Sequence, residues 1–261
     1  MILCARRESV DEAMKELRAF DKNARIRKFL TPEICVIESQ IGFEDLISSL
    51  NSNRVSSIFI RHFFPLELET LPSSEEADAI VRKIAKCERR YNKDEGMVSR
   101  SEFKLREAFD VFKIKPPDSE APSALDLGAS PGGWSRVLLS KGFSVTAADP
   151  APCDSRLSAH PNFTQLQTHA QRLPDGLGPF DLVANDMRMD MFDSCRVTLD
   201  AARFLKRGGE SIMTFKLPHS HKLSATRNAL KLLEQKFEIL SAKQLFHNRD
   251  EVTVYMRLII D

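Results

Sequence analysis

The stretch that decides the fold is Asp126-Leu127-Gly128-Ala129-Ser130-Pro131-Gly132-Gly133-Trp134-Ser135. A short apolar run, Ser123 to Leu127, leads into it, and apolar residues recur with helical spacing from Trp134 to Leu139. The glycines in between let the chain turn sharply and approach a ligand without a Cβ in the way. The pattern therefore predicts a small-molecule pocket at the carboxyl end of a parallel strand, where open α/β sheets bind their ligands.

Three known kinds of pocket use a glycine loop, and the flanking residues separate them. A phosphate-binding P-loop requires Gly-Lys-Ser/Thr, and no lysine follows these glycines. A dinucleotide fingerprint requires G-x-G-x-x-G, whereas the spacing here is G-x-x-x-G-G. Residues 128–132 do match the G-x-S-x-G elbow of serine hydrolases, in which the residue after the serine donates its N–H to the oxyanion. Pro131 has no N–H to donate, so a serine hydrolase is disfavoured.

A second acid, Asp149, follows the next predicted strand, Phe143 to Ala148. An acid about 20 residues beyond a glycine turn is placed to bind a ribose diol. A ribose-binding carboxylate without phosphate-binding groups favours S-adenosylmethionine as the ligand. The alternative that the turn alone leaves open is an ordinary α/β connection with a surface aspartate.

Composition narrows the class of protein. The chain has 261 residues, of which 42% are hydrophobic, enough for one large domain and one small one. Its 38 basic and 37 acidic residues nearly balance, so a polyanion would have to bind a local basic face. The five cysteines are scattered without a C-x-x-C motif or nearby histidines at ligand spacing, which predicts reduced thiols and no metal site.

The sequence predicts neither a signal sequence nor a membrane-spanning segment. The amino terminus becomes charged at Arg6, too early for a signal sequence, and no apolar run is long enough to cross a membrane. We therefore expect a cytoplasmic protein without a membrane partner. The sequence leaves the oligomeric state open.

Residues 1–70 have their own pattern of elements. Apolar periodicity predicts strand, helix, two strands, helix and strand, which is the order of a small ferredoxin-like α+β domain. Such a domain either binds RNA or is a structural or dimerising appendage. The cations available for RNA are Arg25, Arg27, Lys28, Arg54, Arg61 and His62. Residues 71–95 are expected to form a linker and a basic helix.

Residues 96–261 alternate between predicted strands and helices. This alternation predicts a doubly wound, Rossmann-like α/β sheet, whose last two strands can form an antiparallel edge. Asp186 follows one strand and Lys216 ends the next, so both are expected at the edge that carries the glycine turn. A lysine beside Phe215 is costly to bury unless an acid pairs with it, and Asp186 is the expected partner. Such a pair marks a functional site more often than a structural one.

Five motifs follow one another along the chain. They are Ser99-Arg100-Ser101-Glu102-Phe103-Lys104-Leu105, the glycine stretch, Asp181-Leu182-Val183-Ala184-Asn185-Asp186-Met187, Thr214-Phe215-Lys216-Leu217-Pro218 and Arg249-Asp250-Glu251-Val252-Thr253-Val254. In this order they resemble the motifs of the FtsJ-like RNA ribose 2′-O-methyltransferases. The last two are most similar to the RlmM branch, which methylates a cytidine of bacterial large-subunit rRNA and carries an amino-terminal THUMP-containing region. That region is much shorter here, so the target nucleotide is not carried over.

The resemblance implies methylation of a ribose hydroxyl of RNA, with rRNA as the leading substrate and S-adenosylmethionine as the cofactor. It implies a catalytic tetrad of Lys104, Asp186, Lys216 and Glu251. Lys216 is expected to accept the proton of the hydroxyl, Asp186 to orient Lys216, and Glu251 to hold Lys104 or the ribose. No metal is required.

The resemblance also implies a set of cofactor contacts. They are Ser101, Gly128, Ser130, Pro131, Gly132, Gly133, Trp134, Asp149 and Asp186, with His169 where the family usually has an acid near the adenine. The alternatives are methylation of tRNA or of an mRNA cap, and a non-catalytic RNA-binding scaffold with the same fold.

Overall fold

The computed structural model describes residues 1–52, 57–66, 70–88, 91–118 and 120–259. The chain divides into two compact units. Unit 1 is Met1–Arg90 with Ala242–Arg249, and unit 2 is Tyr91–Ser241 with Asp250–Asp261.

Unit 1 contains a four-stranded sheet and three α-helices. Its elements in chain order are β1 (Ile2–Cys4), η1 (Arg7–Ser9), α1 (Val10–Arg18), β2 (Arg25–Thr31), β3 (Ile34–Glu38), α2 (Phe43–Ser52), β4 (His62–Phe64) and α3 (Ser74–Cys87). The strand order is β2-β3-β1-β4, and each neighbouring pair is antiparallel. This topology confirms the expected ferredoxin-like domain.

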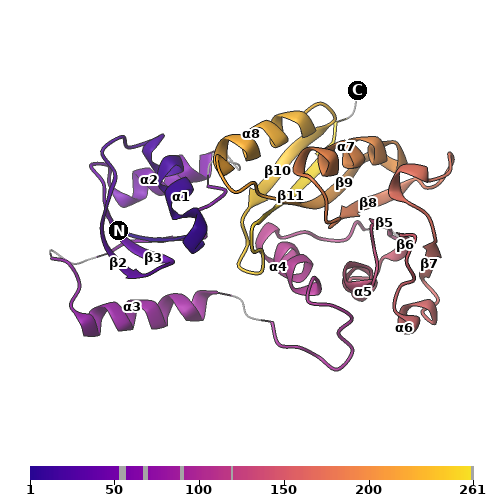
Figure 1. Cartoon of the computed structure of the whole chain (residues 1–261), viewed down its shortest axis with the longest axis horizontal. Helices are drawn as coiled ribbons and strands as arrows, with labels where there is room; N and C mark the ends of the chain where they lie inside the picture. The colour runs from indigo at the N-terminus through magenta and orange to yellow at the C-terminus, as the bar shows by residue number, and fades with distance from the viewer. Residues whose placement is uncertain (53–56, 67–69, 89–90, 119, 260–261) are drawn as a thin grey trace. The chain divides into compact units, whose positions relative to one another are not determined.

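Helix α3 lies on the opposite face of this sheet from α1 and α2 (Figure 1). A capping box between Ser73 and Glu76 starts the helix. One side of it is apolar, and Ile84 packs with Ile2 and Val36 of the sheet. Because of this packing, α3 belongs to unit 1, so the compact units differ from the limits expected from sequence, which placed residues 71–95 in a linker with a basic helix.

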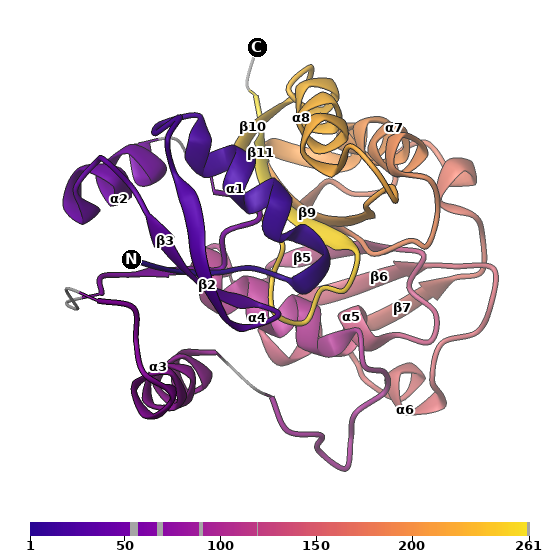
Figure 2. The same cartoon turned by 60° about the vertical axis from the view of Figure 1, so that its left-hand side comes forward.

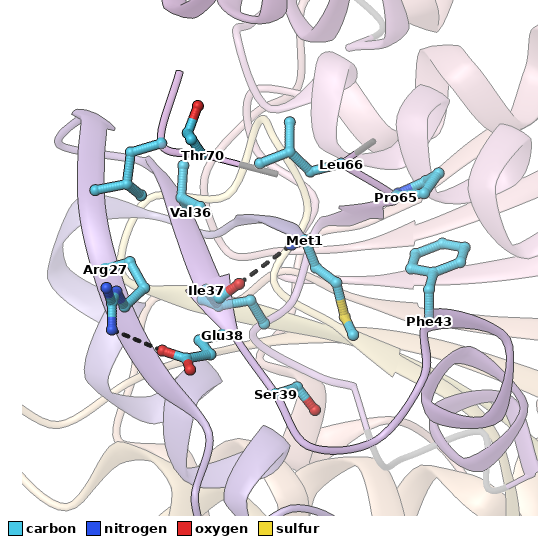
Figure 3. A pocket seen from close by; sticks show the side chains of 11 residues that line it. Met1, Arg27, Val36, Ile37, Glu38, Ser39, Phe43, Pro65, Leu66 and Thr70 are labelled. Carbon is cyan, nitrogen blue, oxygen red and sulfur yellow. Dashed lines mark hydrogen bonds and ion pairs between the residues drawn. The ribbon is translucent and has the colours of Figure 1, made fainter. Parts of the chain in front are cut away.

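Unit 1 also has an open groove of about 940 Å³. Figure 3 shows its lining, which comes from β2, β3, the start of α2 and the segments around Pro65 and Leu71. The two charged side chains among the lining residues, Arg27 and Glu38, bind each other at 2.9 Å. The groove therefore presents this ion pair together with apolar side chains and the hydroxyls of Ser39 and Thr70.

Unit 2 is built on a seven-stranded sheet. Its elements are α4 (Glu102–Phe112), β5 (Ser123–Leu127), α5 (Gly133–Ser140), β6 (Ser144–Ala148), α6 (Ser155–Ser158), β7 (Phe163–Leu166), η2 (Ala170–Arg172), β8 (Phe180–Asn185), α7 (Met191–Ala201), η3 (Ala202–Phe204), β9 (Leu205–Lys216), α8 (Lys222–Leu233), β10 (Phe237–Lys243) and β11 (Glu251–Leu258). The strand order is β10-β11-β9-β8-β5-β6-β7. Helices α7 and α8 cover one face, and α4 and α5 lie side by side on the other (Figure 1 and Figure 2). The doubly wound α/β sheet expected from the sequence is thus confirmed.

The last two strands lie together at one edge of the sheet, as expected. β11 is antiparallel to β9 and lies between β9 and β10, so β10 is the outermost strand. The last strand in the chain is therefore the inner one of this pair. β11 reads Glu-Val-Thr-Val-Tyr-Met-Arg-Leu, and five of its residues are buried in a row, as fits an interior strand.

Three neighbouring parallel strands of unit 2, β5, β6 and β8, end at one level. Leu127 of β5 lies opposite Ala148 of β6 and Asn185 of β8. The residues that directly follow these strands, Gly128, Asp149 and Asp186, therefore gather at the carboxyl edge of the sheet.

Candidate active site

The glycine turn joins β5 to α5, as expected. Gly128 has φ +67° and Gly132 has φ +108°, values that favour glycine over every other residue. A Cβ on Gly128 would lie 2.1 Å from Cγ of Met187, and one on Gly132 would lie 2.1 Å from Cδ1 of Leu157. Both positions therefore require glycine for backbone conformation and for space.

Two aspartates flank the turn. The carboxylate of Asp149 closes it, because Oδ2 accepts from Ser130 N at 3.1 Å and Oδ1 accepts from Ala151 N at 2.8 Å. Asp126 is 1% exposed and accepts a hydrogen bond from Ser135 Oγ at 2.6 Å. Burial raises the pKa of Asp126 to about 7, with repulsion from Asp186 and Asp149 adding to the rise and the Ser135 hydrogen bond opposing it. The turn thus lies in a strongly acidic environment.

A network of ion pairs lies at the end of β8. Lys104 Nζ, on α4, is 3.0 Å from Asp186 Oδ1 and 2.9 Å from Glu251 Oε2, the first residue of β11. All three side chains are less than 20% exposed. Lys104 is therefore held between two carboxylates from different strands.

The charges of this network perturb one another. Burial raises the pKa of Asp186 to about 6, and the neighbouring Lys104 charge opposes that rise. Burial on its own would lower the pKa of Lys104, but the charges of Asp186 and Glu251 outweigh it and leave the pKa raised. Lys104 therefore stays protonated at neutral pH.

The expected pairing of Lys216 with Asp186 is wrong. Lys216 is exposed at the end of β9, and the lysine that pairs with Asp186 is Lys104. The reason is register, because Asn185 lies opposite Met213 and β9 continues for three residues beyond that point. Lys216 lies instead directly opposite Glu251 in the β9–β11 pair, so these two side chains share a face of the sheet.

Other expected cofactor residues serve the turn itself. Trp134 is 2% exposed, and its Nε1 donates to the Ser101 carbonyl at 3.1 Å, so the ring joins α5 to the segment before α4. Ser130 Oγ donates to the Pro152 carbonyl at 3.0 Å, and the Pro131 carbonyl accepts from Asp154 N. His169 is exposed and precedes η2. Their roles toward a cofactor stay predictions.

Sequence reasoning missed two supports of the site, the half-buried Gln165 and the buried Glu102. Gln165 Nε2 donates to the Ala151 carbonyl at 2.7 Å and its Oε1 accepts from Cys153 N at 3.0 Å, which fixes the loop after β6. Glu102 is fully buried beside two arginines. The spacing Ser99-x-x-Glu102 is that of a capping box, a signal that draws attention to Glu102, whereas Gln165 has no such signal.

The cations expected to serve RNA in unit 1 are mostly engaged. Arg61 is 7% exposed and pairs with Glu33 at 2.8 Å and Glu88 at 3.0 Å, so the expectation that it is available is wrong. Arg25 and Arg27 both bind Glu38. Of the other three residues expected to bind RNA, Lys28 donates to the Pro72 carbonyl, and burial lowers the pKa of His62 to about 4. Arg54 lies outside the described residues.

Two absences hold for the part of the chain that the structure describes, residues 1–52, 57–66, 70–88, 91–118 and 120–259. Within them, no helix combines the length and apolar character that a membrane crossing needs. In the same residues, His, Cys, Asp and Glu side chains form no group of three or more that could bind a metal ion.

Comparisons with known proteins agree with this architecture. The chain is 34% identical over 174 residues to "Ribosomal RNA large subunit methyltransferase M" of Laribacter hongkongensis, covering 60% of this chain and 47% of that protein. It is 32% identical over 173 residues to the protein of the same name from Tolumonas auensis, covering 60% and 46%. The chain thus spans about half the length of the curated relatives it matches.

Solved structures show the same fold at low identity. A putative hemolysin from Lactococcus lactis superimposes with TM-score 0.53 at 16% identity, covering 63% of this chain and 89% of that one. The Methanococcus jannaschii fibrillarin pre-rRNA processing protein gives TM-score 0.50 at 18% identity, covering 62% and 76%. The model of the FtsJ-like methyltransferase family matches residues 97–248, which include the glycine turn, Lys104, Asp186 and Lys216. Since this match covers more than half of the sequence, the chain belongs to the FtsJ-like methyltransferase family.

Proposed function

We propose that unit 2 transfers a methyl group from S-adenosylmethionine to a ribose 2′-hydroxyl of RNA, with ribosomal RNA as the substrate. Membership of the family makes S-adenosylmethionine the cofactor. The observation that carries the proposal is the Lys104–Asp186–Glu251 network beside the glycine turn, with Lys216 across from Glu251. The names of the relatives, which act on large-subunit ribosomal RNA, support the choice of substrate.

The residues present fit this cofactor. S-adenosylmethionine supplies a methyl group activated by a positive sulfonium. The carboxylate of Asp149 closes the turn and Asp186 directly follows the neighbouring strand, and negative charge there suits a cationic ligand. Asp149 follows β6, where a carboxylate can bind a ribose diol. We assign cofactor binding to these groups.

The two lysines have different roles in this proposal. Lys104 is fixed and charged between two carboxylates, so it stabilises the negative charge that develops on the ribose oxygen. Lys216 is exposed and lies on the face of Glu251, so it is the lysine that can take the hydroxyl proton when it is itself unprotonated. Asp186 positions Lys104 rather than Lys216, and Glu251 holds Lys104 from the other side.

The test uses the full chain, labelled S-adenosylmethionine and separate rRNA, tRNA and capped mRNA fractions. We expect transfer to rRNA, and we expect Lys216→Ala to abolish single-turnover transfer while calorimetry gives a cofactor Kd within twofold of the wild type. Arg207→Ala is the matched control, because Arg207 is an exposed cation near the other end of the same strand. Transfer confined to tRNA or capped RNA would overturn the substrate assignment.

Two other outcomes would contradict the proposed mechanism or the enzymatic activity, and not only the substrate assignment. If Lys216→Ala kept most of its rate, the role of Lys216 would be wrong. Cofactor binding without transfer to any RNA would favour a non-catalytic scaffold.

A further inference from the structure

A second charged network lies on the other side of α4, away from Lys104. Glu102 is fully buried, and its Oε2 is 2.9 Å from Arg106 Nη2 and 2.6 Å from Arg136 Nη1. Asp94 closes the network from outside, because it binds both arginines at 3.0 Å. Two carboxylates and two guanidinium groups thus alternate, and each guanidinium bridges the two acids.

The other oxygen of Glu102 fixes the chain before the helix. Oε1 accepts from Val98 N at 2.6 Å and from Ser99 N at 3.4 Å. Because Arg136 belongs to α5, Glu102 ties the segment before α4 directly to the helix that begins at the glycine turn. A buried carboxylate is costly unless it is fully paired, and here each of its oxygens has a donor.

The same segment packs against the first residue of α5. A Cβ on Gly133 would lie 2.1 Å from Ser99 Oγ and 2.7 Å from Ser101 Oγ, and these two hydroxyls bind each other at 2.7 Å. Trp134 Nε1 holds the Ser101 carbonyl from the next position. Residues 98–101 therefore lie against the start of α5, where the cofactor is proposed to bind.

Helix α4 carries this network and the proposed active site on opposite sides. Glu102 and Arg106 are four residues apart and share one face. Lys104 is two residues from each, about 200° around the helix, and reaches Asp186 and Glu251. Any change in how α4 rests on α5 is therefore passed on to the position of the Lys104 ammonium.

We propose that Glu102, through its ion pair with Arg136, is a positioning residue that sets Lys104 and the Ser99–Ser101 segment relative to the glycine turn. This inference rests on the proposed function and goes beyond it by adding a residue that touches neither cofactor nor RNA. Glu102 acts by two routes, since its carboxylate orients the helix and caps the segment that precedes it.

The test compares Glu102→Gln with a matched control, Glu210→Gln. The amide keeps an oxygen for Val98 N but removes the charge that holds Arg106 and Arg136. Glu210, in the middle of β9, pairs with Arg257 at 3.0 Å, so its variant also loses one Glu–Arg pair of unit 2. Each variant is measured for single-turnover methyl transfer at saturating cofactor, for cofactor Kd by calorimetry, and for the KM of the RNA.

We expect Glu102→Gln to lower the transfer rate at least tenfold and to weaken cofactor binding about fivefold, with the RNA KM within twofold of the wild type. Glu210→Gln is expected to leave all three unchanged. Arg136→Gln, which alters a side chain that is 28% exposed, removes the same pair if Glu102→Gln fails to fold. The double variant should lose less than the sum of the two single losses, because each single variant already removes the Glu102–Arg136 pair.

Equal behaviour of the Glu102 and Glu210 variants, or additive losses in the double variant, would overturn the inference. The two proposals fail separately. A wild-type chain that transfers no methyl group to RNA contradicts the proposed function, whereas the cofactor Kd still reports on the positioning role of Glu102.

Discussion

The buried carboxyl group of Asp126 makes the stability of unit 2 depend on pH, and Asp126→Asn removes that dependence. The folded pKa is about 7, against an ordinary value of 3.8. Between these values the folded chain holds a proton that the unfolded chain has lost. The free energy of unfolding therefore falls by about 1.4 kcal/mol for each pH unit as pH rises from about 4 to about 7, and then levels off. The total is about 4 kcal/mol.

Asparagine keeps the shape of the side chain and an oxygen that accepts from Ser135 Oγ, but it carries no titrating proton. The difference in unfolding free energy, variant minus wild type, should therefore rise by about 1.4 kcal/mol per pH unit through this range. Titrating groups that do not interact with Asp126 contribute equally to both proteins and cancel in the difference. The unfolding free energy of the variant relative to that of the wild type is therefore highest at pH 8.

Urea denaturation at pH 5, 6, 7 and 8 measures this difference. The chain has a single tryptophan, Trp134, which is 2% exposed, so its emission reports the unfolding of unit 2. Ser135→Ala is a second variant. Because it removes the hydrogen bond that lowers the pKa of Asp126, the pH range over which the unfolding free energy falls should extend to higher pH. Parallel pH curves for Asp126→Asn and the wild type would refute the reasoning.

The remaining predictions concern the turn and the ion-pair network. Gly128→Ala should lower the unfolding free energy by about 1 to 2 kcal/mol from backbone strain, plus a packing cost where the new Cβ meets Met187. Urea denaturation measures this loss. The control is Gly142→Ala, where φ is +91° and the added Cβ meets nothing within 4 Å. Equal losses for the two would contradict a packing role for Gly128. Lys104→Met removes the cation between Asp186 and Glu251, so the pKa of Asp186 should rise further, and unfolding free energy should fall by about 1 to 3 kcal/mol at pH 8. The loss should be smaller at pH 5, where Asp186 takes up a proton, and carboxyl NMR titration together with denaturation at both pH values checks it.

Much of the fold follows from local patterns. The glycine turn was predictable because local sequence alone, an apolar run followed by glycines and a helical pattern, determines the change from strand to helix. The order of elements in both units follows from apolar periodicity. The position of β11 does not follow, because an antiparallel strand inserted between two earlier ones has no local signal that distinguishes it from an edge. The packing of α3 was missed for a similar reason, since only Ile84 in that helix is buried.

The site could be predicted as a set of residues but not as a set of contacts. Strand ends place Asp186, Lys216 and Glu251 at one edge, which the alternation of strands and helices predicts. Which lysine reaches Asp186 depends on the path of α4 over the sheet and on how far β9 extends beyond β8, and neither is encoded in a motif. The four charged groups of the Glu102 network, counting Glu102 itself, come together from three separate segments, so only the tertiary structure reveals their arrangement.

The most direct test of the central claim is where the transferred methyl group lies. After reaction of the full chain with ribosomal RNA and S-adenosylmethionine labelled in the methyl group, the RNA is hydrolysed with alkali and the labelled products are separated. A methylated 2′-hydroxyl cannot attack the adjoining phosphate, so the account predicts that the label is recovered in an alkali-resistant dinucleotide. Label recovered in single nucleotides, as methylation of a base would give, would contradict it.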